Sequence, residues 1–159
     1  TLAPGLRLGF MVVAAPELIA EARVLRRLML RHPPANNQRA AALFISLGHY
    51  DSLLGRVKKS LAERAKILNA ALRTHAPSLS FTPLRGGSSA WVKGPAGMES
   101  GLLAKLAEKQ GILIEPGELF FHQPPTPCPY FRLGFASTPT DKIAEGIKRL
   151  APLVNQARL

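Results

Sequence analysis

An arginine interrupts an apolar run near the start of the sequence. Arg7 follows Pro4-Gly5 and precedes residues 8–14, which are apolar or glycine. Such a run predicts a buried β-strand over residues 6–14. A strand needs hydrogen-bonded neighbours, and no pairing partner is visible in the first 47 residues. We therefore expect residues 1–47 to be the end of a larger α/β unit, and not a domain that is stable by itself.

The composition is that of a globular protein with a strong positive charge. Of 159 residues, 47% are hydrophobic and 19% are charged, which argues against wholesale disorder. The only cysteine, Cys128, excludes an internal disulfide and fits a reducing, cytoplasmic compartment. No apolar run approaches the length of a membrane span. The formal charge of +11 predicts an anionic partner, either a nucleic acid, a phosphate or an acidic surface elsewhere in the parent protein.

The pattern of secondary structure changes along the chain. Apolar residues at helical spacing predict helices from Pro16, over residues 38–47 and from Asp51 to about Thr74. Asn36 or Asn37 can cap the second of these. The remaining elements are expected beyond Pro77: a hairpin of residues 79–82 and 89–93, a helix that ends at Gly111, strands over 112–114 and 130–136, and a last helix opened by residues 138–141.

Two arginines are candidate anion-binding residues. The planar guanidinium of Arg7 can donate two parallel hydrogen bonds to a phosphate, and an arginine inside an apolar strand must find an anion. In the strand over residues 130–136, side chains alternate, so Arg132 and Gly134 face away from the apolar side. Arg132 is thereby suited to clamp a carboxylate. The alternatives are a surface arginine at position 7 and an internal salt bridge at position 132.

Other residue types carry less information about chemistry. The four histidines lack metal-ligand spacing and Cys128 has no partner for a zinc site, so we expect no metal. Trp91, Phe120 and Phe121 are expected in the hydrophobic core.

Four motifs occur in a fixed order over essentially the whole chain. They are Pro4-Gly5-x-Arg7-x-Gly9, Pro83-Leu84-Arg85-Gly86-Gly87 followed by Trp91, the run ILIEPGELFF over residues 112–121, and YFRLGFA over residues 130–136. In this order they resemble the fold-type I aminotransferases that depend on pyridoxal phosphate (PLP). The residues of these motifs are most similar to those of the aminotransferase-like domain of MocR-type regulators. In these proteins a GntR-type winged-helix domain precedes the aminotransferase domain.

This resemblance implies a fold and four site residues. The fold would be α/β with an α+β small domain: residues 1–48 as the C-terminal remnant of a truncated PLP-binding large domain, and residues 49–159 as a complete small domain. Arg7 would bind the cofactor phosphate, and Asn37, in the loop that reaches toward the neighbouring subunit's active site, would also bind the cofactor. Arg132 would bind the substrate α-carboxylate, with Gly86 in the substrate pocket. Ser88 and Ser89 stand where many members place a large apolar residue.

The resemblance also implies the function. The Schiff-base lysine is expected directly before Thr1, so this chain alone should have no transaminase turnover. The intact protein would be a cytoplasmic homodimer that holds PLP, senses PLP or an amino acid, and binds DNA through a separate N-terminal domain. A genuine amino-acid transaminase is the first alternative, and a basic nucleic-acid-binding module is the second. No membrane association is expected.

Overall fold

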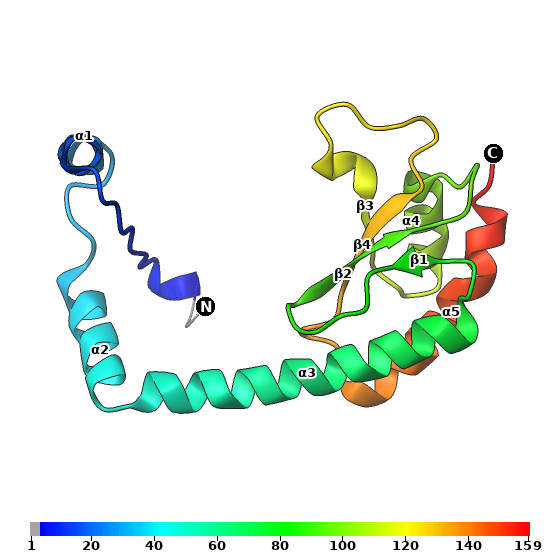
Figure 1. The fold of residues 1–159 in the computed structure, drawn as a ribbon, viewed down its shortest axis with the longest axis horizontal. Coiled ribbons are helices and arrows are strands. Elements are labelled where there is room, and N and C mark those ends of the chain that lie inside the picture. The colour runs from blue at the N-terminus through cyan, green and yellow to red at the C-terminus, as the bar shows by residue number, and fades with distance from the viewer. Residues whose placement is uncertain (1–3) are drawn as a thin grey trace. The chain divides into compact units, whose positions relative to one another are not determined.

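The chain folds into two compact units, Thr1–Arg56 and Val57–Leu159, in a computed structural model that describes residues 4–159 (Figure 1). A long helix, α3 (His49–His75), contributes its first residues to one unit and the rest to the other. Within the described residues, no helix is long and apolar enough to cross a membrane.

The first unit is helical. A short 3₁₀ turn, η1 (Pro4–Leu6), precedes α1 (Pro16–Met29) and α2 (Ala35–Ser46). The helix predicted from Pro16 is confirmed, with proline at the first position and Glu17 in the first turn. The predicted cap of the second helix is wrong. Because α2 already begins at Ala35, both Asn36 and Asn37 lie inside its first turn, and its N-cap is Pro34.

The strand predicted over residues 6–14 is also wrong. The segment after η1 is neither helix nor strand, and Phe10 and Val12 are 95% and 87% exposed. All the strands among the described residues lie between Ser80 and Gly134 and pair with one another. An apolar segment without a neighbouring strand cannot satisfy its backbone groups in a ladder, so the sequence pattern alone does not produce a strand.

The second unit is a four-stranded antiparallel sheet packed with helices. The strand order is β1-β2-β4-β3, with bounds β1 (Ser80–Phe81), β2 (Ser89–Lys93), β3 (Glu115–Pro116) and β4 (Tyr130–Gly134). The predicted hairpin is confirmed by the antiparallel pairing of β1 with β2. The other elements of the unit are α4 (Ser100–Lys109), the 3₁₀ turn η2 (Gly117–Phe120) and α5 (Thr140–Gln156).

The strand predicted over residues 112–114 is displaced toward the C-terminus. Of residues 112–116, only Glu115 and Pro116 pair with β4. The backbone N–H of Ile112 donates to the carbonyl of Ala107, so this segment begins as the continuation of the last turn of α4. The two pairing residues form an edge strand, where the missing N–H of a proline is tolerated.

One hydrophobic core holds this unit together. Its fully buried members include Leu72 from α3, Leu103 from α4, Phe131 from β4 and Leu150 from α5. Each strand of the central pair β2 and β4 turns alternate residues toward this core. The opposite face of that pair is therefore free to carry polar and aromatic residues.

Candidate functional site

Arg132 lies on the sheet face that points away from the core. Its neighbours along β4, Phe131 and Leu133, are buried, whereas the Arg132 side chain is 42% exposed. This confirms the face predicted for Arg132 from the alternation of the sequence. Directly across the sheet, Arg132 pairs with Trp91 of β2 on one side and with Glu115 of β3 on the other.

Two contacts hold the guanidinium of Arg132. Its Nε donates a hydrogen bond to Oε2 of Glu115, and the two groups form an ion pair. This hydrogen bond, with the attraction of the same carboxylate, raises the pKa of Arg132 above its ordinary value. The guanidinium carbon lies 5.4 Å from the ring centroid of Phe120, in cation–π range. The two terminal nitrogens, Nη1 and Nη2, donate to no group among residues 4–159.

A cluster of four aromatic rings contacts this arginine through Phe120. Trp91 stacks on Tyr130 with ring centroids 5.9 Å apart and an angle of 11°, and it meets Phe120 edge-on at 5.5 Å. Phe121 contacts both Trp91 and Tyr130. Trp91 is 42% and Phe120 49% exposed, so the prediction that these rings belong to the core is wrong. The alternation of β2 turns Ala90 and Val92 inward and therefore turns Trp91 outward.

The loop that carries Gly86 is anchored by Asn69 of α3. The Asn69 side chain donates from Nδ2 to the carbonyl of Leu84 and accepts the N–H of Leu84 at Oδ1, both at 3.0 Å. Apart from its two chain neighbours, no atom of the described residues lies within 4 Å of the place where a Cβ of Gly86 would stand. Gly87 has a φ of +86°, a conformation that glycine adopts without strain. Asn69 thus fixes the start of the loop at Leu84, and the turn at Gly86 and Gly87 carries no side chain.

In the first unit, the Asn37 side chain contacts the backbone next to Arg7. Asn37 donates from Nδ2 to the carbonyl of Leu6 at 3.1 Å, and so holds the residue next to Arg7. Arg7 has a φ of +53°, a left-handed conformation that is uncommon outside glycine and that concentrates at functional sites. It is exposed, so the argument from a buried charge fails. No carboxylate of the described residues lies within 4 Å of its guanidinium, which is open to an anion.

The four predicted site residues thus fall into two groups. Arg7 and Asn37 belong to the first unit, and Gly86 and Arg132 belong to the second. Within the second unit, the loop of Gly86 leads into β2, which pairs directly with the strand of Arg132.

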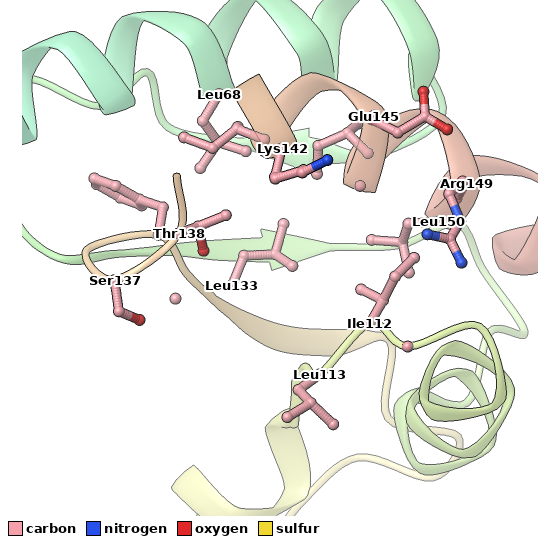
Figure 2. A pocket seen from close by; sticks show the side chains of 16 residues that line it. Leu68, Ile112, Leu113, Leu133, Ser137, Thr138, Lys142, Glu145, Arg149 and Leu150 are labelled. Atoms are coloured by element: carbon pink, nitrogen blue, oxygen red, sulfur yellow. The ribbon is translucent and has the colours of Figure 1, made fainter. Parts of the chain in front are cut away.

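A separate hollow of about 500 Å³ opens at the other side of β4. Figure 2 shows Leu133 of β4 among the side chains that line it, together with Lys142, Arg149 and Leu150 of α5. Leu133 is a residue of the core-facing side, whereas Arg132 faces away. Nη2 of Arg149 is already engaged by the carbonyl of Gln110. This hollow is therefore not part of the candidate site. Across residues 4–159, no three His, Cys, Asp or Glu side chains gather in a way that could hold a metal ion.

Comparison with known proteins decides the family. The profile of the family described as aminotransferase class I and II matches residues 2–150. The chain belongs to this family. Among its relatives is the HTH-type transcriptional regulator TauR of Rhodobacter capsulatus, 40% identical over 151 residues that make up 95% of this chain and 31% of TauR. The predicted resemblance to MocR-type regulators is confirmed by TauR and by the probable rhizopine catabolism regulatory protein MocR of Rhizobium meliloti, 32% identical over 94% of this chain and 30% of MocR.

The aminotransferase fold is confirmed by solved structures. An α-aminoadipate aminotransferase from Thermus thermophilus, complexed with N-(5'-phosphopyridoxyl)-L-leucine, superposes with a TM-score of 0.86 and 27% identity. The superposition covers 97% of this chain and 39% of that enzyme. The class is that of fold-type I, and a phosphopyridoxyl ligand in such a neighbour agrees with the predicted cofactor. The chain spans about a third of the length of these relatives.

Sequence reasoning missed three residues of this candidate site. Glu115 and Phe120 contact the guanidinium of Arg132, and Asn69 fixes the glycine loop. A signal for Glu115 was present, since it is the only charged residue between Gly111 and Gly117. Asn69 gave no signal, because one amide on a helix is ordinarily a solvated residue.

Proposed function

We propose that this chain is part of a PLP-binding aminotransferase-like domain that senses an amino acid or PLP for a MocR-type transcription regulator. The observation that carries the proposal is Arg132 on the outer face of the sheet, whose two terminal nitrogens donate to no group of the described residues. The 40% identity with TauR favours a regulator over other members of the family.

Arg132 is proposed to bind the α-carboxylate of the amino acid. Its terminal nitrogens can donate two parallel hydrogen bonds to one carboxylate. The ring of Phe120 lies over one side of the guanidinium, and Trp91 packs edge-on against that ring. The open turn at Gly86 leaves room for the ligand beside β2, although Ser88 and Ser89 make that wall more polar than a large apolar residue would.

Arg7 is proposed to bind the phosphate of PLP. The residues present fit that role, because Arg7 is exposed and has no carboxylate partner among the described residues. Apart from chain neighbours, no described atom lies within 4 Å of where a Cβ of Gly5 or Gly9 would stand, which leaves room for a phosphate. Asn37 is proposed to act in the same unit by fixing the carbonyl of Leu6. When bound, PLP supplies an electron sink for chemistry at the amino-acid α-carbon.

A genuine amino-acid transaminase is the second candidate. The superposition on the α-aminoadipate aminotransferase over 97% of this chain favours it. A third candidate, a basic nucleic-acid-binding module, rests on the +11 charge alone. In the regulator, DNA contact is instead assigned to a separate N-terminal domain, and the working form is a cytoplasmic homodimer.

The experiment that tests the proposal uses the full-length protein that carries this chain, saturated with PLP. Amino-group transfer is measured with each of the twenty L-amino acids and a 2-oxo acid acceptor, and DNA affinity is measured with and without the same amino acids. A regulator shows ligand-dependent DNA binding without sustained turnover, whereas a transaminase shows turnover.

The matched variants are Arg132→Gln and, on the exposed surface of α3, Arg73→Gln. Loss of the amino-acid response in the first alone supports the carboxylate role of Arg132. An unchanged response in Arg132→Gln contradicts it. Binding to any DNA with a steep salt dependence and no response to ligands supports the basic module instead.

A further inference from the structure

We propose that Glu115 is a positioning residue that orients Arg132 so that ligand carboxylates bind only at its terminal nitrogens. This inference rests on the proposed carboxylate role of Arg132. In this role, Glu115 determines which of the two edges of the guanidinium binds a carboxylate.

The strand register brings the two residues together. Glu115 of β3 is the direct cross-strand partner of Arg132 in β4, so their side chains leave the sheet on the same face. Glu115 accepts the hydrogen bond from Nε of Arg132, and this is the contact between the two side chains. It leaves Nη1 and Nη2 for another acceptor.

The choice of nitrogen determines the geometry. A guanidinium can bind a carboxylate side-on, through Nε and one terminal nitrogen, or end-on, through both terminal nitrogens. Because Glu115 occupies Nε, the side-on edge is closed and the end-on edge is presented. Phe120, with its ring centroid 5.4 Å from the guanidinium carbon, covers one flat side of the same group.

The pair acts by preorganisation and not as a source of fold stability. Both side chains are nearly half exposed, at 42% and 45%, and ion pairs in such positions stabilise a fold little. A free arginine side chain of this exposure would sample several rotamers and would lose that freedom on binding. Glu115 removes part of this cost before the ligand arrives.

The opposite role is competition, in which Glu115 acts as a built-in carboxylate that the ligand must displace. A competitor would have to occupy the edge that the ligand uses. Since Glu115 engages Nε and leaves both terminal nitrogens unengaged, the geometry favours positioning. The two roles predict opposite effects when the carboxylate is removed, so one variant distinguishes them.

The test uses the full-length protein saturated with PLP and a probe that has no amino group, 3-phenylpropionate. Its ring matches the aromatic surroundings of Arg132, and 3-phenylpropionamide is the uncharged control. Calorimetric Kd values are compared for wild type, Arg132→Gln, Glu115→Ala and Glu115→Gln. The matched control is Glu108→Ala, an exposed glutamate on α4. Circular dichroism melting confirms that each variant is folded.

Positioning predicts that Glu115→Ala weakens the binding of 3-phenylpropionate about two- to tenfold, the cost of ordering one long side chain. Glu115→Gln keeps an oxygen acceptor for Nε, so its Kd for 3-phenylpropionate is equal to or lower than that of wild type. Glu108→Ala changes nothing, and the amide probe is insensitive to both Glu115 variants.

Other outcomes overturn the inference. If Glu115→Ala binds the probe as tightly as wild type or more tightly, Glu115 is neutral or a competitor. If Arg132→Gln weakens binding about tenfold or more and Glu115→Ala does not, only the positioning role fails. If wild type does not prefer the acid to the amide, the carboxylate role of Arg132 fails, and the positioning role fails with it.

Discussion

The side chain of Asn37 donates a hydrogen bond to the backbone carbonyl of Leu6 at 3.1 Å, across 31 residues of sequence. It is a tertiary contact that ties the first turn of α2 to the residue before Arg7. An asparagine that looked like a helix cap thus works as a tether for a neighbouring turn.

Removing this tether should weaken cofactor binding without unfolding the unit. Asn37→Ala loses one hydrogen bond, worth about 0.5–1.5 kcal/mol. Because the lost bond fixes the residue next to Arg7, we expect PLP affinity of the full-length protein to fall up to about tenfold. Fluorescence titration with PLP measures this. Asn36→Ala, at an exposed neighbouring position, is the control, and an equal loss in both variants would point to a general defect of α2.

Arg7 itself should matter more than its tether. Arg7→Gln removes the charge and the planar fork, and we expect PLP affinity to fall about tenfold to a hundredfold, as for the loss of charge-assisted hydrogen bonds. Raising the salt concentration should weaken PLP binding in wild type more than in this variant. The control is Arg27→Gln on the exposed surface of α1. The phosphate role is rejected if both variants bind PLP as wild type does.

Asn69 should stabilise both the fold and the glycine loop. Asn69→Ala leaves the N–H and carbonyl of Leu84 without their partner, and we expect a loss of about 1–3 kcal/mol in the free energy of unfolding. Urea denaturation measures this. Amide hydrogen exchange should accelerate over residues 84–88 at denaturant concentrations where the protein remains folded. A uniform acceleration over the whole second unit would contradict this local role.

Gly117 should tolerate no side chain. A Cβ at this position would collide with the backbone carbonyl and the Cβ of Tyr130, neither of which can move without shifting β4. We expect Gly117→Ala to destabilise the fold by about 2–4 kcal/mol, since the overlap is with backbone. Gly146→Ala, in α5, should instead stabilise by up to about 1 kcal/mol, because within residues 4–159 the added Cβ meets no atom within 4 Å apart from its chain neighbours and the backbone of its own helix. Thermal unfolding of the two variants should shift in opposite directions.

The sequence predicted what depends on local periodicity. The helices, the β1–β2 hairpin and the outward face of Arg132 follow from spacings of three to four residues or of two. It failed where the outcome depends on a distant neighbour. Residues 6–14 have the composition of a strand, but among the described residues no strand pairs with them.

The same limit explains the errors within the site. Alternation predicts which residues of one strand share a face, but it does not say which face is covered or how two strands are aligned. Trp91 was therefore expected in the core, although it is outside it. The contact of Glu115 with Arg132 depends on the register of β3 against β4, which no single segment specifies.

That register has a consequence for how the sequence can change. A side-chain period of two means that one residue inserted or deleted between Pro129 and Arg132 exchanges the two faces of β4. Phe131 would then meet water and the arginine would meet the core. Length variation is therefore permitted in the proline-rich loop before Cys128 but not after it. In this strand, a shift of one residue separates an arginine on the outer face of the sheet from an arginine buried in the core.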